Sequence, residues 1–365
     1  MMYFSTSTGE AFKDYMYQYL AEKEKREGFS FSTEMSFAEK ESFINKAILA
    51  DIEKVAGVSL NMEEVNPEIM ANHPNIRFAS FAVVGQLIDQ IIPDVLDKTI
   101  GLYTDSVYGN FGDSFRFDVE PNDLFFVSKA GRDQRTVEFQ KQLNGTQYVI
   151  PSNRAITVYV NLFRVLCGMD SLAKFVMKAI LSVEAQITKE VYQAMDAAML
   201  ELPETPIGGE LKITAAGGTV AKSDAIALAQ RVTAYNGGAQ AIFVGTKVAL
   251  SHLFPDSASG FRYTDAGIAY FRNVWGIDTM ELPQIAEWTD KYKLALDDNH
   301  IYVISPSSQK LVKLCYEGST MSNGVAAYDS ANKTEATTLN KSWGIGIATN
   351  SVAGLIVLGT SPASL

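Results

Sequence analysis

The sequence predicts an α+β fold, and three observations lead to this prediction. Apolar residues recur at helical spacing over the first 60 residues. From Asp113 the spacing changes to every second residue, as in a half-buried strand. A third block, residues 170–200, returns to helical spacing and is far longer than a typical helix of about 11 to 12 residues. We therefore expect a sheet laid across one long helix.

Composition and charge exclude several classes of protein. With 47% hydrophobic residues, the 365 residues suffice for a packed core in two or three lobes. The net charge of −11 argues against a protein that grips nucleic acid, because such proteins neutralise phosphates with a basic surface. The start of the sequence lacks a signal peptide's apolar core, and no apolar run is expected to span a membrane. We therefore expect synthesis in the cytoplasm.

Two amphipathic helices are predicted in the first 60 residues. The first has helical spacing at Phe12, Tyr15, Met16, Tyr19 and Leu20. The second begins at a capping box of Ser36 and Glu39 and ends at Gly57. Its apolar stripe consists of Phe43, Ala47, Ile48, Ile52 and Val55. So much apolar surface needs a cover, either the rest of the chain or a neighbouring copy.

The next region changes from helix to strand. Residues 81–92 predict a short buried helix that ends at the following proline. Farther on, residues 115–119 alternate between apolar and charged side chains, and the runs 136–143 and 146–150 flank Asn144-Gly145. Asn-Gly favours a type I′ hairpin turn, because both central positions of that turn need positive φ. We therefore expect a long, exposed, two-stranded arm that becomes fully ordered on a partner.

A strand and a long helix follow the arm. The strand has Ile156, Val158, Val160 and Leu162 on one face. The helix covers residues 170–200, with Asp170 or Ser171 as its cap, and would be about 45 Å long. Its apolar stripe consists of Leu172, Phe175, Val176, Ala179, Ile180, Val183, Ile187, Val191, Ala194, Met195 and Ala198. The stripe has no strict heptad, so we expect this helix to bind its own sheet, through Phe175, Ile180, Val183 and Ile187.

The last part of the chain predicts a compact α/β lobe. A helix is expected to start at Ser223 or Asp224 and to end at Gly237-Gly238. Other expected elements are a strand at 241–244, short helices at 246–253 and 264–274, a strand at 311–316 and a pair of strands within 343–358. The runs 293–296 and 300–305 flank Asp297-Asp298-Asn299 as a hairpin.

No pattern in the sequence predicts catalysis, a metal or a cofactor. Residues 217–223 resemble a phosphate loop, but Ala221 stands where a glycine must precede the Lys-Ser pair. A glycine turn before a capped helix is the simpler interpretation. The histidines and cysteines lack metal-ligand spacing and form no Cys-x-x-Cys pair; they are His73, His252, His300, Cys167 and Cys315. We expect both thiols to be reduced and buried.

The order of these parts resembles the major capsid proteins of tailed bacteriophages, which have the Hong Kong 97-type capsid fold. Asp297 to Ile304 looks like the hairpin that leads such chains back to the peripheral domain. The resemblance implies a helical N-terminal arm at 1–75 and an extended β-hairpin loop at 108–155. It also implies a peripheral domain from 76–107, 156–205 with a spine helix at 170–200, and 306–340, and an axial α/β domain from 206–305 and 341–365.

The resemblance implies a structural protein and not an enzyme. Copies would form pentamers and hexamers of an icosahedral shell around the double-stranded DNA of a tailed phage, without sequence-specific DNA contacts and without a membrane. Scaffolding and portal proteins would be partners, with assembly in the host cytoplasm and a final place in the virion capsid. The candidate subunit-interface residues lie in the loop: Arg132, Arg135, Lys141, Asn144 and Gly145. No cross-linking acceptor can be matched to Lys129 or Lys141, so we expect no autocatalytic chemistry.

Two alternatives remain open at this point. Encapsulin nanocompartments share the same fold, and a shell that houses an enzyme would have the same order of parts. An α/β enzyme with its substrate in the second lobe is the other alternative, although no catalytic constellation supports it. Length and the long N-terminal segment favour the phage protein over the encapsulin.

Overall fold

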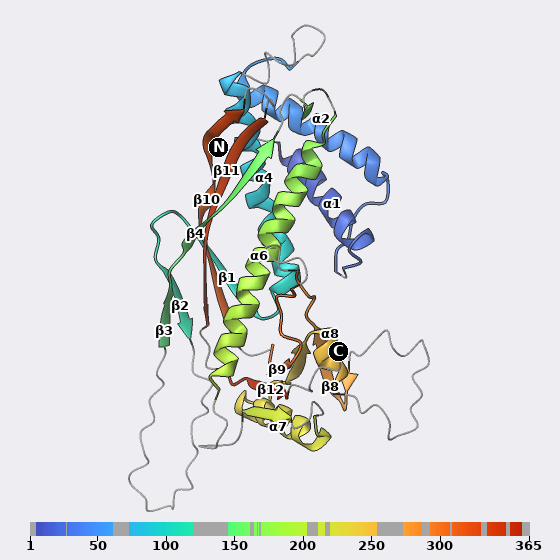
Figure 1. The fold of residues 1–365 in the computed structure, drawn as a ribbon, viewed down its shortest axis with the longest axis vertical. Coiled ribbons are helices and arrows are strands. Elements are labelled where there is room, and N and C mark those ends of the chain that lie inside the picture. The colour runs from blue at the N-terminus through green and yellow to red at the C-terminus, as the bar shows by residue number, and fades with distance from the viewer. Residues whose placement is uncertain are drawn as a thin grey trace, which may run out of the picture.

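The computed structural model consists of two lobes joined along one long helix (Figure 1). It describes residues 5–26, 28–60, 73–119, 145–160, 164–165, 167, 169–202, 211–215, 220–253, 273–286, 293–306, 309–329, 334–347 and 351–359. In these ranges the strands form a four-stranded sheet, a six-stranded sheet and a two-stranded ribbon. The predicted mixture of helix and sheet is therefore confirmed.

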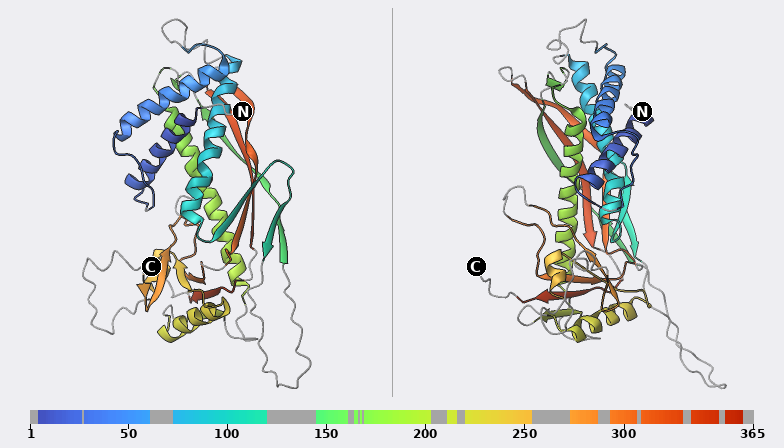
Figure 2. Two further views of the ribbon diagram at one scale, coloured as in Figure 1. Left: turned by 180° about the vertical axis from the view of Figure 1, so that it is seen from behind. Right: turned by 90° about the vertical axis from the view of Figure 1, so that its right-hand side faces the viewer.

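The two N-terminal helices are present and lie on the chain itself. α1 spans Thr6–Glu22 and α2 spans Phe37–Ala56. The capping box of Ser36 and Glu39 forms as predicted, and Gly57 ends α2 in the left-handed conformation, with φ of 67°. One member of the predicted stripe is wrong, because Phe43 is 51% exposed and Ile44 is buried in its place. α2 packs on α4 and on the long helix α6, and α1 packs on α2 and α4, so the rest of the chain covers both helices (Figure 2).

The third helix is longer than the sequence predicts. α4 spans Pro74–Ile100 and contains Pro93, so the expected end at this proline is wrong. Proline removes one hydrogen bond of the helix, but Ile91, Ile92 and Val95 on both sides of it are fully buried, and their packing holds the helix together. By length and composition alone α4 could span a membrane, but 67% of its apolar window is buried inside this chain.

The larger lobe is a four-stranded sheet with helices on one face and a ribbon on the other. Its strands, in spatial order, are β1 (Thr104–Gly109), β10 (Val312–Asp329), β11 (Thr334–Ile347) and β4 (Ser152–Val160). Leu314 and Tyr316 of β10 join the core with α4 and α6. Cys315 lies between them and joins a small cluster under the ribbon. Since successive side chains of a strand point to opposite faces, the helices and the ribbon lie on opposite sides of the sheet.

The ribbon corresponds to the base of the predicted arm. β2 (Phe115–Val119) pairs antiparallel with β3 (Gly145–Val149), and the register ends with Val119 opposite Gly145. The predicted turn at Asn144-Gly145 is wrong, because Gly145 is a strand residue whose φ lies outside the left-handed region. The apolar inner face of β2 offers β3 a better partner, since together they cover the sheet. Residues 136–143 lie outside the described ranges.

The long helix is confirmed nearly to the residue. α6 spans Leu172–Leu200, and Ser171 caps it by accepting a hydrogen bond from the Lys174 backbone N–H. Ile180, Val183 and Ile187 are buried as predicted, whereas Phe175 is only half-buried. Polar residues that the predicted stripe does not contain are buried as well: Glu184, Thr188 and Tyr192.

The smaller lobe is a six-stranded sheet at the lower end of α6 in Figure 1. Its strands, in spatial order, are β5 (Lys212–Ala215), β12 (Gly354–Leu358), β9 (His300–Ile304), β6 (Ile242–Gly245), β8 (Ile277–Glu281) and β7 (Asn273–Val274). Helices α7 (Lys222–Tyr235) and α8 (Lys247–Ser251) accompany it. Ile301 and Val303 face the core with α7 and α8, and Tyr302 and Ile304 face the larger lobe. The central strand β9 is therefore buried on both faces.

Several local predictions for this lobe are corrected. Ala221, not Ser223, is the residue before α7, and no side chain caps that helix. Asp297-Asp298-Asn299 is not a hairpin turn, because β9 pairs with β12 and β6 while Leu294 forms a bridge with Ala286. The two strands expected within 343–358 exist as β11 and β12, but they belong to different sheets. Of the helix expected at 264–274, residues 264–272 lie outside the described ranges and Asn273–Val274 is strand β7.

Candidate assembly surface and the contacts of the spine helix

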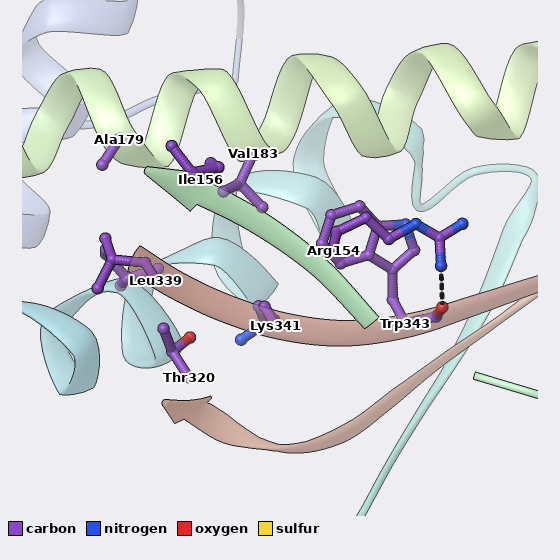
Figure 3. A pocket seen from close by; sticks show the side chains of 9 residues that line it. Arg154, Ile156, Ala179, Val183, Thr320, Leu339, Lys341 and Trp343 are labelled. Atoms are coloured by element: carbon purple, nitrogen blue, oxygen red, sulfur yellow. Dashed lines mark hydrogen bonds between the residues drawn. The ribbon is translucent and has the colours of Figure 1, made fainter. Parts of the chain in front are cut away.

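Three polar clusters tie the spine helix α6 and its neighbour α4 to both sheets. In the first, Glu190 of α6 accepts hydrogen bonds of 2.9 Å from Arg154 Nη2 of β4 and from Trp343 Nε1 of β11. Arg154 Nη1 also donates to the Trp343 carbonyl oxygen at 2.9 Å, and its guanidinium lies 4.9 Å from the indole ring (Figure 3). Arg154 of the sheet thus neutralises the charge of Glu190 on the helix.

A small cavity lies beside this cluster, between α6 and the sheet. Its volume is about 20 Å³, and its wall includes Ile156, Ala179, Val183 and Leu339 (Figure 3). A cavity needs roughly 10 to 15 Å³ to hold one water molecule, and substrate pockets are larger by more than tenfold. The space under the spine is therefore a packing gap and not a binding pocket.

The second cluster joins α4 to the two central strands. Asp89 of α4 accepts hydrogen bonds of 2.6 Å from the backbone N–H and the hydroxyl of Thr320 in β10. Its carboxylate also accepts a hydrogen bond from Lys341 Nζ of β11. The side chain of Lys341 is only 9% exposed, so its ammonium group depends on Asp89 for compensation.

The third cluster joins the end of α6 to the smaller lobe. Asp196 Oδ1 lies 2.6 Å from His300 Nδ1 and accepts a hydrogen bond of 2.8 Å from the Tyr302 hydroxyl. The hydrogen bond to Asp196 raises the pKa of His300, against the effects of burial and of Lys212. Burial alone would raise the pKa of Asp196, but the hydrogen bonds from His300 and Tyr302 outweigh it and hold that pKa below its usual value. The contact therefore favours the charged form of both side chains and links the two lobes.

This pair predicts a pH dependence of stability. Because the pKa of His300 is raised on folding, its contribution is complete below the unfolded value of 6.5 and is lost as the pH rises through the folded pKa. We expect the thermal midpoint to fall through this group as the pH rises from 6 towards 9. In His300→Gln this component should vanish, whereas His252→Gln, which changes a histidine outside the pair, should keep it. Identical pH profiles for the parent and His300→Gln would show that the pair does not stabilise the fold.

The ribbon β2–β3 presents a mixed surface to solvent. Its inner face packs Phe115, Phe117 and Val149 on Cys315 of the sheet. Its outer face carries the exposed ion pair of Arg116 and Asp118 and the exposed side chains of Tyr148 and Ile150, which are 61% and 85% accessible. Phe111, in the connection before β2, is 77% exposed. The face of the ribbon turned away from the sheet thus carries both apolar and charged side chains.

The predicted interface residues are only partly placed by the structure. Gly145 is the first residue of β3, at the open end of the ribbon. Arg132, Arg135, Lys141 and Asn144 lie outside the described residues. Tyr148 and Ile150 were missed as surface candidates. Tyr148 and Ile150 lie on either side of buried Val149 in the sequence, and this alternation is the signal that could have identified them.

The remaining histidines and the Lys222-Ser223 pair lie at the ends of helices. His73 precedes α4, His252 ends α8, and Lys222 and Ser223 begin α7. Cys315 is buried as expected, but Cys167 is only half-buried. Within the described ranges, no three His, Cys, Asp or Glu side chains lie close enough together to hold a metal ion.

Comparison with known proteins connects this geometry to capsid subunits. Residues 20–357 match the model of the family described as "SPbeta prophage-derived putative capsid protein YonB". No curated protein matches the chain. The chain is similar to a capsid chain of the native GTA particle, with a TM-score of 0.50 and 12% identity, over 72% of this chain and 90% of that one. The empty GTA particle gives a TM-score of 0.50 and 10% identity, with the same coverage. At these identities the likeness concerns the fold, and it confirms the expected capsid fold.

Proposed function

Since this chain belongs to the YonB family of prophage-derived capsid proteins and is a major capsid protein of a phage shell, we propose that many copies of it close into an icosahedral shell around double-stranded DNA. The match to the family model over residues 20–357 is the observation that carries this proposal. Shell closure uses the same subunit surfaces many times, so modest contacts between copies add up to a stable container. An encapsulin-type compartment is not favoured by these matches.

In the assembled shell the subunit would consist of a peripheral and an axial domain, connected by the spine helix. In this proposal residues 76–107, 156–205 and 306–340 form the peripheral domain around the spine helix, together with the rest of β11 up to Ile347, which stays in the larger sheet. Residues 206–305 and the C-terminal strand β12 form the axial domain. The polar clusters at Glu190 and Asp196 support a rigid connection between them, because each ties α6 to a different sheet. The spine would then keep the two domains in one orientation while pentamers and hexamers form.

The extended loop at 108–155 would make the contact with a neighbouring copy. Arg132, Arg135, Lys141 and Asn144 belong to the segment between β2 and β3, and the exposed outer face of the ribbon leads into it. Long-range attraction between charged side chains and a neighbour speeds docking and fixes its register. The chain as a whole is acidic, with a net charge of −11, which suits basic loop side chains that bind another copy.

The DNA would be held by the closed shell and not by base contacts. A net charge of −11 gives the subunit no general affinity for phosphates. Scaffolding and portal proteins would take part in assembly in the host cytoplasm, before the shell becomes part of the virion. The role of the chain is structural in this proposal, and it requires no catalytic residue, metal or cofactor.

Removal of charge from the loop tests this proposal. The triple variant Arg132→Ser, Arg135→Ser, Lys141→Ser should give folded subunits that form few or no particles, because the charged side chains that contact the neighbour are gone. The control removes three exposed lysines elsewhere, with Lys46→Ser, Lys54→Ser and Lys247→Ser, and should assemble normally. Particle yield by sedimentation and electron microscopy distinguishes the two. Normal particles from the loop variant would refute the assignment of these side chains to the interface.

A further inference from the structure

The N-terminal helices bury most of their apolar side chains within their own subunit. Phe12, Tyr15 and Met16 of α1 and Ile44 and Ile48 of α2 have no exposed surface. They belong to the same continuous core as α4, α6 and the four-stranded sheet, and Figure 2 shows α1 and α2 lying along the upper part of α4 and α6. A segment that became buried only against a neighbouring copy would leave such an apolar stripe exposed in the isolated subunit. These helices are instead part of the subunit's core.

Helix α2 also completes the start of the spine. The first backbone N–H groups of a helix have no partner within the helix. Asn45 Oδ1 of α2 accepts a hydrogen bond of 2.9 Å from the Ala173 N–H of α6, and Asn45 Nδ2 donates to Ser171 Oγ at 3.0 Å. Glu41 of α2 pairs with Lys174 Nζ at 3.0 Å. The spine therefore takes part of its N-terminal cap from a helix more than 100 residues away in the sequence.

A second contact reaches the middle of the spine. Glu184 of α6 is only 3% exposed, and its carboxylate accepts a hydrogen bond from Arg26, in the connection between α1 and α2. Thr99 of α4 donates to the same oxygen at 3.1 Å. Burial raises the pKa of Glu184, while Arg26 and Thr99 act in the opposite direction. Without Arg26, the buried carboxylate would lose its paired cation.

We propose that residues 5–56 act as a clamp, in which α1 and α2 hold α4 against the spine, and that this clamp stays in the subunit after assembly. Removing it would uncap α6, leave Glu184 buried without its cation and expose the core side of α4. Neither a separable arm nor a scaffolding segment removed by proteolysis fits these contacts. The statement about the assembled shell rests on the proposed function, whereas the clamp itself concerns one subunit.

Hydrogen exchange in unassembled subunits tests the clamp. Asn45→Ala should speed exchange of the amides in the first turn of α6 about fivefold, because that turn loses a cap. Its control, Lys46→Ala, changes the exposed neighbour and should leave these amides unaffected. Arg26→Met should lower the thermal midpoint and speed exchange around Glu184, and adding Glu184→Gln should restore most of both. Lys23→Met is the control for Arg26. Unchanged exchange along α6 in Asn45→Ala and Arg26→Met would overturn the clamp.

Mass spectrometry of purified particles tests whether the clamp is retained. Peptides from α1 and α2 should be recovered in the same ratio to α7 peptides as from the unassembled chain. Particles whose subunits begin after residue 56 would overturn retention. If no particles form under any condition, the proposed function fails, and the exchange experiment still decides whether the clamp exists.

Discussion

A variant in which an Asn-Gly dipeptide replaces residues 121–143 should fold normally and form no shells. Val119 and Gly145 are directly opposite each other in the ribbon, so Glu120 and Asn144 can be joined by a two-residue turn without changing the register. The cluster of Phe115, Phe117 and Val149 on Cys315 is kept. The thermal midpoint should therefore stay within about 2 °C of the parent, because the buried contacts of the ribbon are retained.

The loss of shells follows from the proposed role of the removed segment, which contains Arg132, Arg135 and Lys141. Sedimentation and electron microscopy measure particle formation. The Cys315 thiol gives a check on the ribbon, because it lies buried beneath β3 and should remain unreactive towards a thiol reagent in both proteins. Particles of normal size from the shortened chain would show that the segment is not required for contacts between copies.

Asp89→Ala should be among the most destabilising single substitutions in the chain. It removes the carboxylate that pairs with Lys341 and accepts both hydrogen bonds from Thr320. Lys341 is 9% exposed, and an ammonium group left unpaired at such a site costs about 3 to 5 kcal/mol of the free energy of unfolding. Chemical denaturation of the unassembled subunit measures this loss.

The matched control is Asp118→Ala, which breaks the exposed pair with Arg116 and should cost about 1 kcal/mol or less. Adding Lys341→Met to Asp89→Ala should recover much of the loss, because the buried charge is then gone. If Asp89→Ala and Asp118→Ala had the same effect, the buried cluster would not stabilise the contact between α4 and the sheet.

Elements with strong local signals could be predicted from the sequence. The spine helix has a long apolar stripe and a serine cap, and α2 has a capping box and a glycine end, so both begin and end close to the expected residues. The strand at 115–119 was also expected, because one of its faces is apolar and the other charged. In each case the local preference and the packing in the fold agree.

Elements decided by distant contacts could not be predicted. Pro93 predicts a helix end, but the buried turns around it keep α4 continuous. Asn144-Gly145 predicts a turn, but the apolar face of β2 draws residues 145–149 into the ribbon. Asp297-Asp298-Asn299 predicts a hairpin, but β9 finds its partners in β6 and β12, which are far away in the sequence. A local preference for a turn is overridden where a different strand pairing buries a larger apolar surface.

The contacts of the spine were the least predictable part of the molecule. The sequence shows ordinary polar residues of an amphipathic helix at Glu184, Glu190 and Asp196. No feature nearby in the sequence identifies the residues with which they pair. The partners are Arg26, Arg154 and His300, which lie between 36 and 158 residues away. The loop residues are the opposite case, since the sequence pattern together with the family resemblance selects them, and their interface role remains a prediction.

Electron microscopy of the full-length chain tests the central claim most directly. The chain should be expressed alone and together with a candidate for the proposed scaffolding partner, and purified particles should be imaged. We expect closed shells of uniform size, built from pentamers and hexamers of this subunit, in at least one of the two preparations. A chain that stays monomeric at high concentration in both would contradict its proposed self-assembly into a shell.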